Sequence, residues 1–157
     1  MLLKDKVAFI TGAASGLGRA TAENFIAAGA NVMIFDLNEE NAEKAASELG
    51  DNATFAAGDV ANADAVSAAI DKTLSQYGAL HININSAGIG AASRTLGRDG
   101  PMDLKMFEFV IRVNLVGTFN CLRLCANAMQ SNEPVTEDGE RGVIVNVASV
   151  AAFDGQI

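Results

Sequence analysis

Short apolar segments alternate with longer segments of helical periodicity along the whole chain. The apolar segments are rich in Val, Ile and Phe, and they predict strands at about 6–11, 31–36, 53–57, 80–85 and 142–148. Apolar positions with helical spacing predict helices between them, near 16–29, 39–49, 62–77 and 103–130. Because such alternation is typical of consecutive β-α-β units, we expect an α/β fold with a doubly wound parallel sheet.

Residues that favour helix ends stand at the expected boundaries. Gly29 and Gly50 follow the first two helices, where glycine readily adopts a positive φ. Asn38, Asn62 and Asp103 precede the next three, and their short polar side chains favour the N-cap position.

Two long polar segments interrupt the alternation. Residues 90–101 follow the fourth expected strand, so we expect a loop at the carboxyl edge of the sheet, where ligands bind in folds of this kind. Residues 131–142 join the last helix to the fifth strand at the opposite edge. There we expect a solvated excursion or a subunit contact.

Composition and charge limit the classes of partner. The 157 residues are 50% hydrophobic and include two prolines, which fits a single globular domain. The formal net charge is -8 and no run of basic residues exists, so we expect neither nucleic acid nor a membrane surface as a partner. We also see no apolar segment that approaches the ~20 residues of a membrane-spanning helix.

The amino terminus and the cysteines indicate neither export nor a metal site. Residues 1–6 lead into a strand pattern without the apolar core of a signal peptide, so we expect a cytoplasmic protein. Cys121 and Cys125 lie one helical turn apart and far in sequence from the single histidine, His81. We interpret both as small apolar residues of one helix face.

A glycine-rich loop, residues 11–18, lies between the first strand and the first helix. Gly12 permits a sharp turn, Gly16 lets the backbone approach a phosphate, and Gly18 lets helix and strand come close. The helix N-terminus adds free N–H groups and partial positive charge. We therefore predict a pyrophosphate-binding loop. The alternative is a strand-to-helix turn that only tolerates glycine.

An acidic residue, Asp36, ends the second expected strand. In dinucleotide-binding folds a carboxylate at this point accepts hydrogen bonds from the adenosine ribose and repels a 2′-phosphate. Neither Ala14 nor Leu37 supplies a compensating cation, which favours NAD(H) over NADP(H). Asp36 could instead only help to cap the next helix, although Asn38 is better placed for that role.

Weaker signals follow the third and fourth strands. Asp59 could meet the amino group of an adenine ring and Val60 could pack on the ring. The small residues Ser86, Ala87 and Gly88 would let backbone run against the ribose and the phosphates. Another turn could look the same.

These motifs, in this order, resemble the short-chain dehydrogenase/reductase family. The resemblance rests on Thr-Gly-x-x-x-Gly-x-Gly at 11–18, Asp36, Asp59-Val60, Asn85-x-Ala87-Gly88, Asn114 within a long helix and Ser149 ending the fifth strand. Residues 131–134, 141–146 and 148–153 resemble the type 2 3-hydroxyacyl-CoA dehydrogenases within that family. The resemblance implies a Rossmann fold and oxidation of a secondary alcohol, here 3-hydroxyacyl-CoA to 3-ketoacyl-CoA, by hydride transfer to NAD.

The resemblance also assigns roles to residues. Asn114 would interrupt its helix and hold a proton-relay water, and Ser149 would hydrogen-bond to the substrate oxygen. A plain helix residue and a cap are the simpler alternatives. No metal is implied. The expected cofactor-binding residues are Gly12, Ser15, Gly16, Leu17, Gly18, Asp36, Asp59, Val60, Ser86, Ala87 and Gly88.

The family's acid–base pair is a tyrosine and, one helical turn later, a lysine, both beyond the serine. The only tyrosine here is Tyr77, and no lysine follows Lys105. We interpret Tyr77 as a packing residue and His81 as an ordinary strand-start residue. We expect residues 1–157 to be the NAD-binding Rossmann part of a single-domain enzyme, with the sheet truncated after about the fifth strand.

Three further points stay open from the sequence. By resemblance, the full-length protein would be a homotetramer, and the mitochondrial matrix is a possible location. A non-catalytic NAD-binding module is a second hypothesis, motivated by the missing tyrosine and lysine. An NADPH-dependent ketoacyl reductase is a third, and Asp36 disfavours it.

Overall fold

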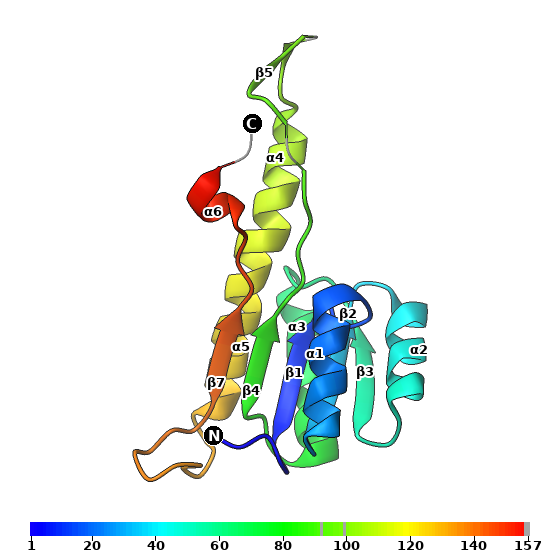
Figure 1. Cartoon of the computed structure of the whole chain (residues 1–157), viewed down its shortest axis with the longest axis vertical. Helices are drawn as coiled ribbons and strands as arrows, with labels where there is room; N and C mark the ends of the chain where they lie inside the picture. Colours follow the sequence, from blue (N-terminus) through cyan, green and yellow to red (C-terminus); the bar gives the residue numbers. More distant parts are fainter. Residues whose placement is uncertain (92, 99, 156–157) are drawn as a thin grey trace.

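A five-stranded parallel sheet forms the centre of the molecule (Figure 1). The computed structural model describes residues 1–91, 93–98 and 100–155. The strand order is β3-β2-β1-β4-β7 and every neighbouring pair is parallel, which confirms the predicted doubly wound sheet. The order reverses between β1 and β4, and ligands bind at such a switch point. The strands are β1 (Val7–Thr11), β2 (Asn31–Asp36), β3 (Ala53–Ala57), β4 (Ile82–Asn85) and β7 (Val143–Asn146).

Helices cover both faces of this sheet (Figure 1). The helices α1 (Gly16–Ala27) and α2 (Glu39–Leu49) lie on one face. The helices α3 (Ala63–Tyr77) and α5 (Thr118–Met129) lie on the other. Because side chains alternate along a strand, β1 serves both cores. Ala8 and Ile10 belong to the core with α1 and α2, and Phe9 to the core with α3 and α5.

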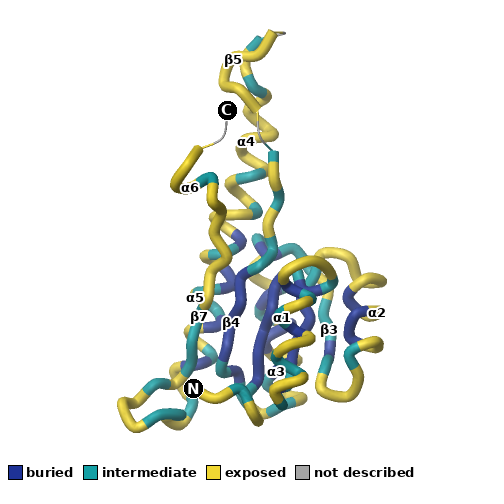
Figure 2. The backbone as a smooth tube through the Cα atoms, viewed as in Figure 1, coloured by how far each residue is buried: buried dark blue, intermediate teal, exposed yellow. Residues whose placement is uncertain are grey.

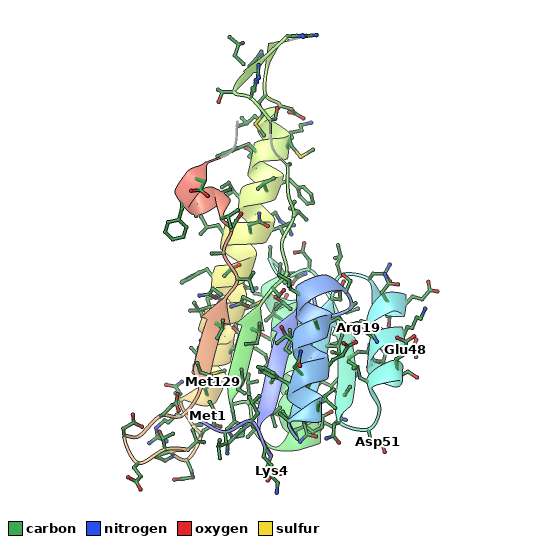
Figure 3. All side chains as sticks on the ribbon, viewed as in Figure 1. Met1, Lys4, Arg19, Glu48, Asp51 and Met129 are labelled. Atoms are coloured by element: carbon green, nitrogen blue, oxygen red, sulfur yellow. The ribbon has the colours of Figure 1, made fainter. Side chains whose placement is uncertain are left out.

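The two helices on the first face are joined by charge as well as by packing. Arg19 on α1 pairs with Glu23 one turn later at 3.1 Å and with Glu48 on α2 at 2.8 Å. Figure 3 shows Arg19 and Glu48 between the two helices. These side chains are partly exposed, so we expect the pairs to add little to stability.

The expected caps are present, and the structure shortens several elements. The side chains of Asn38, Asn62 and Asp103 each accept a backbone N–H at the start of the following helix. Gly29 and Gly50 have φ values of 87° and 85°. The fourth and fifth strands are only four residues long each, although the flanking residues His81 and Val147 still make backbone bonds to neighbouring strands.

The expected helix 103–130 is continuous but not uniform. It consists of α4 (Leu104–Ile111), the π-helical segment η1 (Arg112–Gly117) and α5. A π-helical segment adds a residue to a turn and shifts the helix face that follows it. Asn114 lies inside this segment, as the resemblance implied.

This helix also corrects the expectation about apolar segments. By length and composition the helix Leu104–Met129 could cross a membrane, and its most apolar part is only 22% buried. These criteria are weak evidence, since core helices of globular proteins meet them too. Exposed apolar side chains such as Leu115 and Phe119 account for the low burial.

Three segments project from the sheet and are largely exposed (Figure 2). The expected loop at 90–101 contains a short antiparallel pair, β5 (Leu96–Gly97) and β6 (Gly100–Pro101). This pair lies beyond the amino-terminal end of α4. The short helix α6 (Ala151–Asp154) follows β7. The segment 131–142 lies near the amino terminus, and the side chain of Asn132 fastens it to the carbonyls of Leu80 and Arg141.

The cysteines are buried, as expected for apolar packing residues. Cys121 and Cys125 are free thiols that lie in the core with α3 and α5. Burial raises the pKa of the Cys121 thiol to about 12 and raises the pKa of Cys125 as well. A thiol of this kind is unreactive at neutral pH. No group of three or more metal-binding side chains occurs among the described residues.

Candidate functional site

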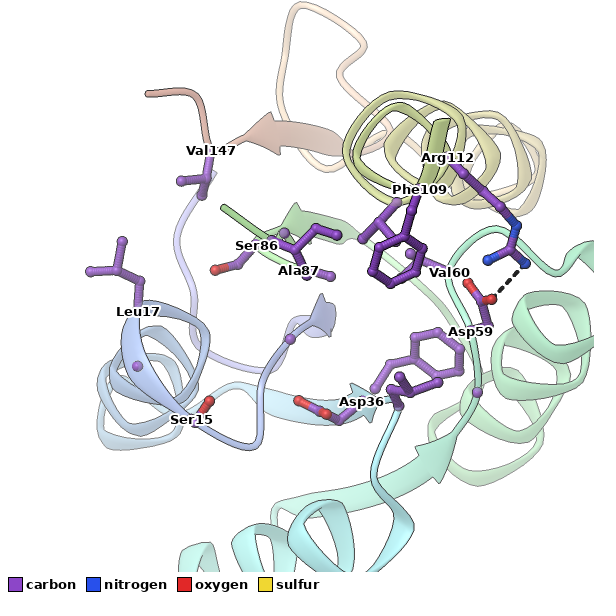
Figure 4. A pocket seen from close by; sticks show the side chains of 18 residues that line it. Ser15, Leu17, Asp36, Asp59, Val60, Ser86, Ala87, Phe109, Arg112 and Val147 are labelled. Atoms are coloured by element: carbon purple, nitrogen blue, oxygen red, sulfur yellow. Dashed lines mark ion pairs between the residues drawn. The ribbon is translucent and has the colours of Figure 1, made fainter. Parts of the chain in front are cut away.

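A pocket of about 440 Å³ lies at the carboxyl edge of the sheet. Its volume falls within the range of small-molecule sites. It is lined by the segments that follow β1, β2, β3, β4 and β7 and by one face of the helix that begins with α4 (Figure 4). The lining residues are Gly12, Ser15, Gly16, Leu17, Phe35, Asp36, Leu37, Gly58, Asp59, Val60, Ser86, Ala87, Gly88, Ile89, Phe109, Arg112, Val113 and Val147.

The glycine loop has the geometry expected of a phosphate cradle. Gly12 has φ +63°, and a Cβ there would lie 2.9 Å from Ala87 Cα, so the turn requires glycine. Gly16 has φ +52° with no atom within 4 Å of its Cβ position, which leaves its backbone open to the pocket. A Cβ on Gly18 would lie 2.4 Å from the Gly12 carbonyl oxygen. Gly18 therefore supports the loop from behind and does not line the pocket.

The start of α1 offers polar groups to the pocket. Ser15 stands at the N-cap position, but its side chain makes no capping hydrogen bond. Ser15 and Leu17 both line the pocket, and the N-terminus of α1 carries partial positive charge. These features suit an anion such as a pyrophosphate.

A buried threonine fastens the glycine loop to the end of β4. The Thr11 hydroxyl accepts hydrogen bonds from the backbone N–H groups of Ser86 at 3.1 Å and Ala87 at 3.0 Å. Thr11 is 1% exposed, so these bonds are shielded from water. The residues Ser86, Ala87 and Gly88 are thereby held along one wall of the pocket.

Asp36 lies at the end of β2 with its carboxylate held by two backbone donors. Oδ2 accepts from the N–H of Ala14 at 3.1 Å, and Oδ1 accepts from the N–H of Asn38 at 3.3 Å. Asn38 itself caps α2, so Asp36 is not needed for that purpose. The carboxylate is fixed between the glycine loop and the β2 end, facing the pocket (Figure 4).

Asp59 and Val60 line the pocket after β3, as predicted. Asp59 Oδ1 accepts from the N–H of Ala61 at 2.8 Å, and Oδ2 pairs with Arg112 Nη2 at 2.6 Å (Figure 4). Val60 is 8% exposed and belongs to the core with α3 and α5. The ion pair between Asp59 and a cation from the helix was not predicted from the sequence.

Three asparagines join the strands beneath the pocket. Asn83 Nδ2 donates to the carbonyl of Phe9, and Asn85 Nδ2 donates to the side-chain oxygens of Asn83 and Asn146, both at 2.9 Å. These bonds link β1, β4 and β7. Asn85 Oδ1 has no partner among the described residues. In sequence, residues 82–85 alternate apolar and polar side chains, which indicates a strand but not the partners of its asparagines, so this network was not predicted.

Asn114 connects the π-helical segment to the chain after β4. Its Oδ1 accepts from the N–H of Ile89 at 2.9 Å, and its Nδ2 donates to the carbonyl of Ile89 at 2.8 Å. Asn114 is exposed and does not line the pocket. It does position Ile89, which lines the pocket.

Ser149 lies three residues beyond the end of β7 and not within the strand. Its Oγ accepts from the N–H of Ala151 at 3.2 Å, so it caps the turn that leads into α6. The side chain is exposed and lies outside the pocket lining. This bond does not occupy the donor of the hydroxyl, which is open to solvent at the carboxyl edge.

The structure brings most of the predicted cofactor-binding residues together and adds others. All of them except Gly18 line the pocket, whereas Asn114 and Ser149 stand beside it. Among the lining residues that were not predicted, Phe109, Arg112 and Val113 share one helix face. Arg112 and Val113 follow Phe109 by three and four residues, which is about one helical turn. That spacing was the available signal, but the sequence did not say which face meets the sheet edge.

Tyr77 and His81 lie outside the pocket lining, as expected. The Tyr77 hydroxyl is buried at the end of α3 without a hydrogen-bond partner among the described residues, and burial raises its pKa. His81 Nδ1 accepts from the N–H of Val7 at 3.2 Å. Both residues serve the fold.

Known proteins are similar to this chain in sequence and in fold. The model of the short chain dehydrogenase family matches residues 6–157. The 3-hydroxyacyl-CoA dehydrogenase type-2 of Drosophila melanogaster is 46% identical over 99% of this chain and 62% of its own length. The human 3-hydroxyacyl-CoA dehydrogenase type-2 is 45% identical over 99% of this chain and 60% of its length.

Solved structures give the same result. The chain matches the crystal structure of 3-hydroxyacyl-CoA dehydrogenase type-2 from Mycobacterium avium with a TM-score of 0.91 and 39% identity, over 99% of this chain and 61% of that one. It matches 3-ketoacyl-(acyl-carrier-protein) reductase from Brucella melitensis, complexed with NADH, with a TM-score of 0.87 and 34% identity, over 98% and 61%. The chain therefore spans about three fifths of the length of these relatives.

Proposed function

The chain belongs to the short-chain dehydrogenase family, and from this membership we propose that it holds the dinucleotide of an NAD(H)-dependent oxidoreductase. The observation that carries the proposal is the Asp36 carboxylate, fixed by the N–H groups of Ala14 and Asn38 at the edge of the pocket. A carboxylate in this position suits the hydroxyls of an adenosine ribose.

The same carboxylate supports NAD(H) over NADP(H). A 2′-phosphate on the ribose would meet the negative charge of Asp36. Among the described residues that line the pocket, the only cationic side chain is Arg112, and it is paired with Asp59. No lining cation is therefore free to compensate a phosphate beside Asp36.

The pocket fits the rest of a dinucleotide. The open backbone at Gly16, the unused side chain of Ser15 and the N-terminus of α1 suit the pyrophosphate. The close approach of Gly12 to Ala87 leaves a smooth wall for the ribose. When bound, the nicotinamide would supply the acceptor or donor of a hydride.

Binding measurements test the nucleotide preference. We expect NADH to bind at least about 100-fold more tightly than NADPH, because NADPH loses charge-assisted hydrogen bonds to Asp36 and brings a second negative charge beside it. Asp36→Ala should weaken NADH and improve NADPH, while Asp51→Ala, at an exposed turn, should change neither. NADPH binding as tight as NADH binding would overturn the cofactor assignment.

For the substrate, we propose a secondary alcohol, and specifically a 3-hydroxyacyl-CoA. Support comes from the similarity to relatives named 3-hydroxyacyl-CoA dehydrogenase type-2. The exposed Ser149 hydroxyl would donate to the substrate oxygen, and Asn114 would hold the proton-relay water beside the pocket. Each residue has a structural duty as well, since Ser149 caps a turn and Asn114 positions Ile89.

Turnover tests the substrate. Purified full-length protein should reduce NAD+ in the presence of 3-hydroxybutyryl-CoA, whereas residues 1–157 alone should be inactive. Ser149→Ala in the full-length protein should lower kcat by roughly 100-fold, as for the loss of one donor to the reacting oxygen. Ser131→Ala is the matched control, because Ser131 is exposed and does not line the pocket. Folded protein that binds NADH but gives no turnover would remove the substrate proposal and leave the cofactor proposal standing.

A nucleotide-binding module without turnover is a second candidate. The observation in its favour is that Tyr77, the only tyrosine of this sequence, has a buried hydroxyl outside the pocket lining. An NADPH-dependent ketoacyl reductase is a third, favoured by the similarity to 3-ketoacyl-(acyl-carrier-protein) reductase. Turnover excludes the second candidate, and preference for NADH excludes the third.

We also propose that the protein assembles as a homotetramer. The long helix presents exposed apolar side chains at Leu104, Phe107, Ile111, Leu115 and Phe119. A contiguous apolar surface of this extent usually marks an interface. Light scattering coupled to size exclusion should give four times the mass of the purified chain, and a monomer would contradict the proposal.

A further inference from the structure

The outer wall of the pocket comes from a helix face that no motif identified. Phe109, Arg112 and Val113 all line the pocket, and Phe109 lies about one helical turn before the other two. Figure 4 shows Phe109 and Arg112 reaching from the helix towards the segment that carries Asp59 and Val60. This is the part of the pocket where adenine is expected.

The helix is locked in position against that segment. A Cβ on Gly117 would lie 2.4 Å from Val60 Cγ2, so helix and segment touch directly. Asn120 Nδ2 donates to the Val60 carbonyl at 2.8 Å. Arg112 therefore extends from a fixed point and reaches Asp59 Oδ2 at 2.6 Å.

The ion pair is suited to orient a side chain more than to stabilise the fold. The side chains of Arg112 and Asp59 are 49% and 29% exposed, and pairs with such exposure add little to folding. However, Arg112 takes one carboxylate oxygen of Asp59 while the N–H of Ala61 takes the other. Two donors on opposite oxygens fix the plane of the carboxylate, whose other lone pairs stay available.

Phe109 supplies a different kind of contact. It is 49% exposed although it is aromatic, and its ring lies at the pocket and not in the core. An aromatic ring that faces an open pocket can stack on a planar base. Val60 offers an apolar surface from the other element that lines this part of the pocket.

We propose that Phe109 and Arg112 form the outer wall of an adenine subsite and select adenine over hypoxanthine. This inference rests on the proposed function, because it assumes a bound adenine dinucleotide. Phe109 packs on the purine ring. Arg112 is a positioning residue that holds the Asp59 carboxylate towards the 6-amino group, which hypoxanthine replaces with an oxygen that a carboxylate repels.

The experiment compares two dinucleotides by the change in nicotinamide fluorescence on binding. NADH and reduced nicotinamide hypoxanthine dinucleotide differ only at the 6-position of the purine, where an oxygen replaces the amino group, and at the adjacent N1, which then carries a proton. The unsubstituted protein should prefer NADH by about tenfold, as for one hydrogen bond to a charged group. Arg112→Ala should reduce this preference to about threefold, because Ala61 still holds one oxygen of Asp59.

The ratio of the two affinities separates positioning from general damage. A loosened pocket would weaken both dinucleotides equally, whereas a misplaced Asp59 changes the ratio. Arg112→Lys, which keeps the charge, should restore part of the preference. Lys105→Ala, which removes a cation of α4 that does not line the pocket, should leave the preference unchanged. Thermal unfolding of each variant shows that the fold is retained.

Phe109 has its own expected result. Phe109→Ala should weaken both dinucleotides by roughly tenfold without changing their ratio, because stacking does not depend on the 6-substituent. The affinities of Phe109→Leu should lie between those of the unsubstituted protein and those of Phe109→Ala. Phe107→Ala should not change them, because Phe107 is exposed and does not line the pocket.

Two failures are distinguishable. If the unsubstituted protein binds neither dinucleotide, the proposed function is wrong. If it binds NADH but shows no preference, or if Arg112→Ala keeps the full preference, the assignment of the adenine subsite is wrong while the proposed function stands. Unchanged affinity in Phe109→Ala would remove the stacking role alone.

Discussion

The carboxyl edge of the sheet has two unequal halves. We name them after their proposed roles: the nucleotide side comprises residues 11–18, 36, 59–60 and 86–88, and the substrate side comprises Asn114 and residues 147–154. On the nucleotide side, loops follow directly from buried strands and are held by Thr11, which is 1% exposed. On the substrate side, Ser149 and its neighbours are exposed and make mainly local bonds.

This difference indicates how each half keeps its geometry. The nucleotide side is anchored in the core through buried residues such as Thr11, Gly18 and Val60, so a change at these residues should affect folding and binding together. The substrate side is attached to the core by few contacts, so a change there should affect function with little effect on stability. Substitutions on the two sides should therefore differ both in what they disturb and in how much.

Gly18→Ala should have the largest effect. Its Cβ would lie 2.4 Å from the Gly12 carbonyl oxygen and 3.0 Å from Ala13 Cα, and backbone atoms cannot rotate away. We expect the free energy of unfolding to fall by roughly 2–3 kcal/mol, the cost of overpacking, and nucleotide binding to fall with it. Urea denaturation measures the first and fluorescence titration the second.

Gly90→Ala is the matched control for that variant. Gly90 has no atom within 4 Å of its Cβ position and no positive φ. We expect its unfolding free energy to change by less than about 0.5 kcal/mol, as for most surface substitutions. Equal losses in both variants would show that the glycine loop is no more constrained than an exposed chain.

Thr11→Val should have the next largest effect on stability. Valine keeps the shape of threonine but removes the oxygen that accepts from Ser86 and Ala87. Two backbone donors lose their partner, so we expect a loss of about 2 kcal/mol in urea denaturation. Thr21→Val, which removes a hydroxyl bonded to Leu17 on the surface of α1, should cost much less. A similar cost for both would contradict the contrast between core and surface.

Asn114→Ala probes the substrate side. It removes both hydrogen bonds to Ile89, but the residue is exposed, so water replaces much of what is lost. We expect about 1 kcal/mol in unfolding free energy and faster hydrogen exchange of the Ile89 amide. Asn127→Ala, at an exposed position of α5, should not affect that amide. Unchanged exchange at Ile89 would mean that Asn114 does not position this wall of the pocket.

The same contrast explains what the sequence could predict. The glycine loop and Asp36 were found because their roles depend on local spacing and on the end of a strand, and both are fixed by short-range order. The segment 82–85 shows the limit, since Asn83 and Asn85 are buried in a network that needs Asn146 from 61 residues away from Asn85. No local pattern reports such a partner.

The helix face at Phe109 and Arg112 was missed for a related reason. Periodicity assigns residues to one face but does not say which face meets the sheet edge. The π-helical segment Arg112–Gly117 also shifts the phase, so the face that lines the pocket differs from the one that continues along α5. The exposed position of Ser149 likewise depends on how the chain leaves β7, which a strand pattern does not specify.

The smallest predicted effect concerns the amino-terminal ends of β1 and β4, opposite the pocket. There His81 Nδ1 accepts a hydrogen bond from the N–H of Val7. Only the neutral imidazole can accept this bond. Burial, with a contribution from Lys6, lowers the pKa of His81 below its usual value of 6.5. The stabilisation is therefore fully present above about pH 6.5 and is lost as the pH falls through the lower folded-state pKa.

We expect this bond to contribute about 0.5 kcal/mol, because the histidine is only partly buried. Urea denaturation at pH 7.5 and at lower pH values should show the unsubstituted protein losing slightly more stability on acidification than His81→Leu, whose side chain does not titrate. Because acidic residues titrate equally in both proteins, the difference isolates the histidine. If the two curves fall in parallel, the Nδ1 bond does not contribute to stability, and β1 and β4 are joined at this end by backbone bonds such as His81 N–H to the Val7 carbonyl.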